Sequence, residues 1–151
     1  MFNIVLYQPE IPPNTGNIIR LCANTGCHLH LIEPLGFKLE DKQLRRAGLD
    51  YHEWAEVKTY RSIDELQPEH AIYALSTKGK KHYHQAEFKA GDYLVFGPET
   101  RGLPEDYLNT LHAEHILRLP MREHSRSLNL SNTVAIVVYE ALRQNQFSGF
   151  E

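Results

Sequence analysis

Short apolar segments alternate with longer amphipathic segments along this chain, and the alternation limits its fold more than any other feature. The apolar segments are bounded by turn residues, as buried strands are, and lie at 2–7, 28–33, 71–76, 93–97 and 115–119. The segments predicted to be helical lie roughly at 14–25, 40–47, 62–67, 104–110 and 130–144. Strands that alternate with helices predict an α/β fold, with a mainly parallel sheet covered by helices on both faces.

The first and last predicted helices carry boundary signals of their own. Asn14 is the predicted N-cap of the first helix, and Gly26 is its predicted C-terminal stop. The last segment is ambiguous, because its valines and Ile136 favour a strand, whereas its length and its Ser/Asn-rich opening favour a helix. We predict a helix that is apolar nearly all round, buried by the core and by a second subunit. A central helix in a monomer is the alternative.

The overall composition excludes several classes of protein. A chain of 151 residues suits one domain, and 42% hydrophobic with 23% charged residues is ordinary for a globular protein. The formal net charge of −3 means that any nucleic-acid site must be a local patch. Cys22 and Cys27 fit neither a zinc site nor a disulfide framework, so we expect reduced thiols in a cytoplasmic protein. No apolar run resembles a signal peptide or reaches the ~20 residues of a membrane span.

Common nucleotide-binding and hydrolase motifs are absent from the sequence. It contains no P-loop, no G-x-G-x-x-G fingerprint and no G-x-S-x-G elbow. Two histidine pairs, His28 with His30 and His82 with His84, have strand spacing but no third ligand nearby. We therefore predict exposed or hydrogen-bonded histidines and no metal site.

Three turns rich in glycine, proline and asparagine remain, at 9–20, 96–104 and 117–131. The second follows a predicted strand, and Glu99 and Arg101 project from the position where open α/β sheets bind ligands. The third places a cluster of Ser and Asn residues before the apolar last helix, which suits both a helix cap and a ligand pocket.

The first turn has two explanations. The backbone N–H groups of Asn14, Thr15 and Gly16 would form an anion site if the helix began there. Taken by itself, the stretch is explained more simply by a capped helix that carries an exposed Arg20.

Taken together, NTGNIIR (14–20), FGPETRGLP (96–104) and SRSLNLSNTVAIVVYEA (125–141) resemble the three motifs of the SPOUT (α/β-knot) RNA methyltransferases. The similarity spans the whole chain, and in detail it is to the small TrmL type, which methylates the ribose 2′-hydroxyl of the wobble nucleotide of tRNA. The resemblance implies one domain over 1–151 with a deep C-terminal trefoil knot. It also implies S-adenosyl-L-methionine as methyl donor, no metal, a homodimer, and the tRNA anticodon loop with cytidine or uridine at position 34.

The resemblance also assigns residues to the site. The catalytic role falls on Arg20, which we expect to orient the 2′-hydroxyl or a phosphate, because arginine keeps its proton and makes a poor general base. Contacts with the cofactor fall on Leu75, Gly97, Leu119 and Ser127, and within the same motifs on Glu99, Gly102, Met121, Leu128 and Asn132. The glycines would let the loop backbone approach the ligand closely.

Basic side chains provide candidates for contacts with RNA phosphates, although a solvated surface would explain some of them equally well. These candidates are Arg45, Arg46, Lys80, Lys81, Arg122 and Arg126. Three alternative functions stay open. They are a non-catalytic RNA-binding or assembly factor with the same fold, a methyltransferase for another RNA site, and a flavodoxin-like nucleotide-binding domain.

Overall fold

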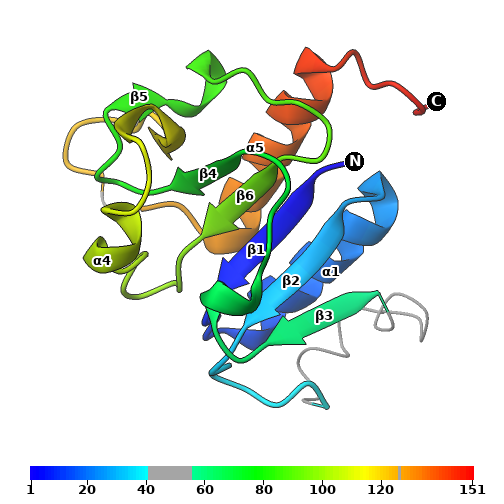
Figure 1. Cartoon of the computed structure of the whole chain (residues 1–151), viewed down its shortest axis with the longest axis vertical. Coiled ribbons are helices and arrows are strands. Elements are labelled where there is room, and N and C mark those ends of the chain that lie inside the picture. The colour runs from blue at the N-terminus through cyan, green and yellow to red at the C-terminus, as the bar shows by residue number, and fades with distance from the viewer. Residues whose placement is uncertain (41–55, 126) are drawn as a thin grey trace.

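The computed structural model describes residues 1–40, 56–125 and 127–151, which form a parallel sheet with helices on both faces (Figure 1). Within these residues the strands are β1 (Asn3–Tyr7), β2 (His28–Ile32), β3 (Val57–Tyr60), β4 (Ile72–Leu75), β5 (Lys81–His82), β6 (Tyr93–Phe96) and β7 (Ile116–Arg118). The α-helices described are α1 (Pro12–Thr25), α4 (Glu105–Leu108) and α5 (Leu130–Gln144). The strand order is β3-β2-β1-β6-β4-β7-β5 with every pairing parallel, which confirms the predicted α/β class.

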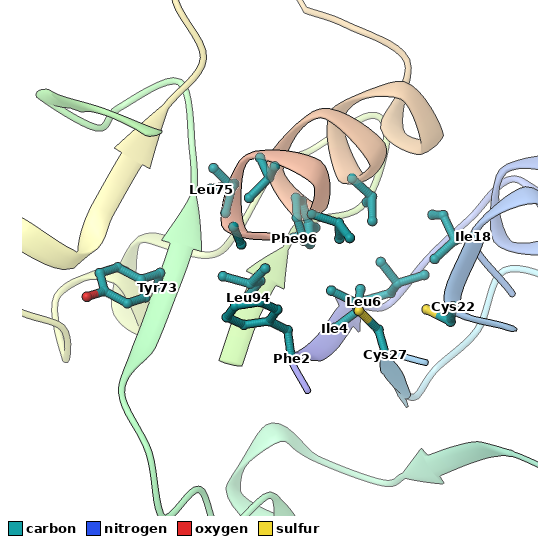
Figure 2. Packing of buried hydrophobic residues seen from close by; sticks show 14 of the residues in the cluster. Phe2, Ile4, Leu6, Ile18, Cys22, Cys27, Tyr73, Leu75, Leu94 and Phe96 are labelled. Carbon is teal, nitrogen blue, oxygen red and sulfur yellow. The ribbon is translucent and has the colours of Figure 1, made fainter. Parts of the chain in front are cut away.

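Alternating side chains of the strands divide the core into two layers. Ile4 and Leu6 of β1 belong to the core cluster that also contains Ile18 of α1 and Val137 of α5. Figure 2 shows Ile4, Leu6 and Ile18 in this layer. Val5 points to the opposite face and packs in the layer that contains Leu108 of α4. This period-2 alternation is why both faces of the sheet need a helical cover.

The strongest sequence signals correspond to observed elements. The last helix covers 130–144 as predicted, and Gly26 ends α1 in the left-handed conformation with φ of 78°. Two of the predicted helices are wrong. The segment 104–110 contains only one turn of α-helix, and 62–67 contains a 3-10 turn at Ile63–Glu65. Pro68 disfavours helical backbone at the residue before it. The helix predicted at 40–47 falls almost wholly outside the described residues.

Two strands were not predicted from the sequence, because they are short and polar. β3 reads VKTY, and β5 has only the two residues Lys81 and His82. Each lies at an edge of the sheet and pairs with one neighbour, β2 or β7. Their strand character therefore depends on a partner strand, and a local apolar pattern does not reveal it.

The first helix begins earlier than the sequence suggested. Pro12 and Pro13 occupy its first positions, where a missing N–H leaves no hydrogen bond unmade. The predicted N-cap Asn14 is instead buried inside the helix, and the N-cap is Ile11, whose side chain makes no capping bond. The N–H groups of Asn14 and Thr15 donate to the Ile11 carbonyl, at 3.1 and 3.4 Å. These two N–H groups are therefore not available to bind an anion, which was one of the two explanations of this turn.

The helix α5 buries one face and exposes another. Val134, Val137 and Val138 are fully buried, whereas Ile136 and Tyr139 are 38% and 47% exposed. The core of this chain therefore buries one face of α5. The face that we predicted to be covered by a second subunit is exposed in the single chain. Across the described residues, no helix combines the length and apolarity needed to cross a membrane.

The histidine His30 is buried in a hydrogen-bonded network between β1, β2 and β3. Its Nδ1 lies 2.8 Å from the Tyr60 hydroxyl, and its Nε2 lies 2.9 Å from Oδ1 of Asn3. The Asn3 amide nitrogen donates elsewhere, to a backbone carbonyl, so its Oδ1 must accept from a protonated Nε2. Burial, followed by the charges of Lys58 and His28, lowers the pKa of His30 to about 4. The lowered pKa leaves this single proton on the ring near pH 7, so Nδ1 accepts from the Tyr60 hydroxyl.

This lowered pKa predicts acid sensitivity. An unfolded chain binds a proton at His30 below its ordinary pKa of 6.5, whereas the folded chain resists protonation until about pH 4, so stability falls as the pH drops through this window. We expect protonation of His30 in the unfolded chain to lower the free energy of unfolding by at most about 2 kcal/mol between pH 7 and pH 5. In urea denaturation at both pH values, His30→Gln should lose less unfolding free energy between pH 7 and pH 5 than the wild type. An equal loss in the two proteins would show that His30 is not the source of the acid sensitivity.

Candidate active site

A cavity of about 600 Å³ opens where the loops after β4, β6 and β7 meet the start of α5. Its lining residues are drawn mainly from the segments 75–78, 96–103, 118–121 and 125–133. The carboxyl ends of parallel strands form the usual ligand site of open α/β sheets. A volume of this size is typical of pockets for small ligands and cofactors.

Most of the predicted cofactor contacts lie together in this cavity. The residues that line it are Leu75, Gly97, Glu99, Gly102, Leu119, Met121, Ser127 and Leu128. Asn132 is not among the lining residues; it is exposed on α5, and its backbone N–H donates to Oδ1 of Asn129. The lining also includes residues that were not predicted as site residues, among them Thr77, Lys78 and Arg118. Their positions at the ends of predicted strands could have indicated them.

The loop after β6 folds back tightly on its own backbone. A Cβ atom at Gly97 would lie 2.5 Å from the Leu103 nitrogen and 2.6 Å from the Gly102 carbonyl carbon. Gly102 has φ of 70°, and its N–H donates to the Pro98 carbonyl at 3.1 Å. The loop's own packing therefore requires glycine at 97, in addition to any close approach of a ligand.

Two carboxylates join this loop to the start of α1. The Glu99 oxygens accept from the backbone N–H groups of Glu10 and Ile11 at 2.9 and 2.8 Å, and from Nδ2 of Asn14 at 3.2 Å. In the opposite direction, Glu10 accepts from the backbone N–H and the hydroxyl of Thr100 at 3.0 and 2.7 Å. These bonds from Thr100 lower the pKa of Glu10. The exchange holds two walls of the cavity in one arrangement.

Asn14 extends this network to the third motif. Its Oδ1 accepts from Nδ2 of Asn129 at 2.9 Å, and Oδ1 of Asn129 caps α5 by accepting from the N–H and hydroxyl of Ser131. The Asn14 side chain thus bridges Glu99 and Asn129, which lie 85 and 115 residues further along the chain. The Ser/Asn cluster therefore serves as the helix cap, as part of the cavity wall and as the connection to α1.

Changing Glu99 to Gln tests the network. An amide has a single acceptor oxygen, so one backbone N–H would lose its acceptor and would face the NH₂ group instead. We expect Glu99→Gln to lower the unfolding free energy by about 1–3 kcal/mol in urea denaturation. The exposed Glu69 offers a matched control, and Glu69→Gln should change little. Equal stabilities of the two variants would exclude the proposed bracing role.

The predicted catalytic and RNA-contacting residues lie outside the cavity lining or outside the described residues. Arg20 is half-buried on α1, about one and a half turns beyond Asn14, and does not line the cavity. Lys81 is paired with Glu114, with Nζ 3.1 Å from Oε2. Lys80 and Arg122 are exposed, and Arg45, Arg46 and Arg126 fall outside the described residues.

In the described part of the chain, neither metal ligands nor cysteines form a second reactive centre. Among the described residues, no group of three or more His, Cys, Asp or Glu side chains could hold a metal ion. Cys22 and Cys27 are buried free thiols beside a smaller cavity of about 200 Å³. Burial raises the pKa of both thiols, which keeps them protonated and weakly reactive.

Comparisons with known proteins agree with this geometry. A model of the SpoU rRNA methylase family matches residues 1–139. A tRNA (cytidine(34)-2′-O)-methyltransferase of Saccharophagus degradans is 60% identical over 152 residues, which cover 99% of each chain. A solved structure that gives insights into the 2-OH methylation of C/U34 on tRNA is 44% identical, covers 97% of both chains and has a TM-score of 0.88. The SpoU methyltransferase AviRb from Streptomyces viridochromogenes, solved in complex with AdoMet, shares the fold at 22% identity and a TM-score of 0.81, covering 97% of this chain and 58% of that chain.

These matches confirm the resemblance to SPOUT methyltransferases that the three motifs indicated. The trefoil knot stays a prediction, because strand order and pairing describe neighbours and not the threading of the chain. Since the family match begins at residue 1 and ends inside α5, it includes the first two motifs, all but the last two residues of the third, and every strand described, and the chain belongs to the SpoU rRNA methylase family.

Proposed function

We propose that this protein transfers a methyl group from S-adenosyl-L-methionine to the ribose 2′-hydroxyl of nucleotide 34 in tRNA. The 60% identity to a tRNA (cytidine(34)-2′-O)-methyltransferase over 99% of the chain supports the substrate and the position. The observation that carries the proposal is the cavity of about 600 Å³, in which three distant motifs meet.

The cavity has the chemistry expected of a site for S-adenosyl-L-methionine. Leu75, Leu119 and Met121 provide apolar cover for a purine ring. The tight loop 97–103 forms one wall of the cavity, and Ser127 adds a small polar side chain. When bound, this cofactor supplies an electrophilic methyl group. The residues of the cavity hold it in one orientation, and such positioning provides much of the rate in a displacement reaction.

Arg20 acts on the ribose in this proposal. Its position outside the cavity lining suits a group that contacts RNA more than one that contacts the cofactor. A guanidinium keeps its proton at neutral pH, so Arg20 orients the 2′-hydroxyl and stabilises the negative charge that develops on its oxygen.

The function can be tested by methyl transfer to defined tRNAs. Purified protein with radiolabelled S-adenosyl-L-methionine should label a tRNA that has cytidine or uridine at position 34, and should not label the same tRNA with a 2′-deoxyribose there. Label that persists in the 2′-deoxy tRNA would place the reaction at another RNA site. Binding of tRNA without any transfer would support the non-catalytic alternative.

We further propose that the protein works as a cytoplasmic homodimer that binds the anticodon loop of tRNA. The exposed face of α5 supports the dimer, because Ile136 and Tyr139 leave apolar surface uncovered there. The exposed Phe147 ring lies beside the Tyr139 ring, with centroids 6.2 Å apart, and extends this apolar surface beyond the helix.

Changing Tyr139 to Asp tests the dimer. A carboxylate buried at an apolar interface without a partner is costly, so we expect the dimer dissociation constant to rise by roughly 30-fold or more. Sedimentation velocity at micromolar concentration measures this change. Ala90→Asp adds the same charge at an exposed loop position and should leave assembly unchanged. A wild-type monomer at that concentration would rule the dimer out.

A further inference from the structure

The charges in the cavity lining are unbalanced. Among the described residues that line the cavity, Glu99 is the one acidic residue, and both its oxygens accept hydrogen bonds from the start of α1. Arg101 is directed to Glu10, with Nε 3.6 Å from Oε2. Lys78 and Arg118 also line the cavity, and neither forms an ion pair with the residues that the structure describes.

Arg118 carries a buried donor that has no acceptor. Its Nε is shielded from solvent and makes no hydrogen bond to the described part of the chain. A buried N–H without a partner is costly, and native proteins rarely tolerate one that no ligand or water satisfies. Because Arg118 lines the ligand cavity, a small movement of its side chain on ligand binding would bring this N–H to an acceptor on the bound group.

A fixed turn places Lys78 beside the same cavity. The Ser76 N–H donates to the Leu117 carbonyl at 2.8 Å, and the Gly79 N–H donates to the Ser76 carbonyl at 3.0 Å. The Ser76 hydroxyl accepts from the Lys78 N–H at 3.1 Å, which completes the turn. A Cβ atom at Gly79 would lie 2.7 Å from the Leu117 carbonyl carbon, so the turn lies directly against the backbone of β7. Arg118, the next residue of β7, is therefore held close to this turn.

We propose that Lys78 and Arg118 form an oxyanion-binding subsite in the cavity. The inference rests on the proposed function and names the chemistry that this part of the site recognises. An arginine guanidinium binds carboxylates and phosphates through paired N–H groups, and a nearby ammonium adds a second positive charge. Two reactants carry such a group: the methionine end of the cofactor carries a carboxylate, and the nucleotide next to the target ribose carries a phosphate.

The first arm of the test compares two ligands by calorimetry with the full chain. S-adenosylhomocysteine has the carboxylate, whereas 5′-methylthioadenosine has the same adenosine and thioether without the amino-acid end. If the subsite takes the carboxylate, Lys78→Gln and Arg118→Gln weaken S-adenosylhomocysteine binding by roughly tenfold or more. Binding of 5′-methylthioadenosine stays unchanged, which also shows that each variant is folded.

The second arm measures methyl transfer to tRNA at several salt concentrations. If the subsite takes a phosphate, both small ligands bind the variants normally. The KM for tRNA then rises by roughly tenfold, and the salt dependence of tRNA binding becomes weaker. Lys89→Gln removes an equal charge at an exposed position outside the cavity lining, and should match wild type in both arms.

Two negative results have different meanings. If wild type binds S-adenosylhomocysteine, and Lys78→Gln and Arg118→Gln behave like Lys89→Gln in both arms, the oxyanion subsite is wrong and the proposed function stands. If wild type binds neither small ligand, the proposed function fails and the subsite fails with it.

Discussion

Replacing Arg20 with alanine should reduce methyl transfer to tRNA by roughly a hundredfold or more, while the protein still folds and binds S-adenosylhomocysteine. Arg20 lies on α1 outside the lining of the cavity, so its loss should leave the cofactor pocket intact. Alanine is as good a helix former as arginine, so α1 should persist. Single-turnover transfer from labelled cofactor measures the rate, and calorimetry measures the binding.

The Arg20→Lys variant separates two explanations of that loss. If the planar guanidinium orients the hydroxyl through paired hydrogen bonds, lysine should restore little activity. Near-complete activity with lysine would show that a simple positive charge suffices. Loss of S-adenosylhomocysteine binding in Arg20→Ala would instead show that Arg20 supports the cofactor pocket or the fold. It would contradict the proposal that Arg20 acts on the ribose while the cavity residues bind the cofactor.

Replacing Gly97 with alanine should abolish cofactor binding and lower the unfolding free energy by about 1–3 kcal/mol. The added methyl would lie 2.5 Å from the Leu103 nitrogen, so the loop after β6 would have to open. That loop also carries Glu99, so its displacement would break the bonds to α1 and reshape the cavity. Urea denaturation and calorimetry measure the two effects.

A second glycine provides the control. Gly149 lies near the carboxyl end of the chain, and a Cβ atom added there would have no heavy atom within 4 Å. Gly149→Ala should therefore cost only the strain of its φ of 88°. It should bind S-adenosylhomocysteine like wild type. Normal cofactor binding by Gly97→Ala would show that the loop tolerates a side chain, and that its tight packing is not required for the site.

Much of the architecture was accessible from the sequence because hydrophobic burial leaves a local pattern. The apolar strands β1, β2, β4, β6 and β7 and the long helix α5 were all predicted near their observed positions. Each of these elements buries its own apolar side chains, so its composition and period indicate it without knowledge of its neighbours. The motifs around Gly97 and Ser127 were likewise recognisable, because their residues are close together in the chain.

The connections within the site were decided by the tertiary structure. No local pattern predicts that Asn14 bridges Glu99 and Asn129, because hydrogen bonds across 85 and 115 residues depend on how the strands are ordered. The same holds for Lys78 and Arg118, which reach one cavity because β4 and β7 are adjacent in the sheet. The sequence by itself determined these apolar elements and the chemistry that their motifs carry. Only the parallel pairing of strands distant in the chain determined which side chains face each other, since it brings their carboxyl ends to one edge.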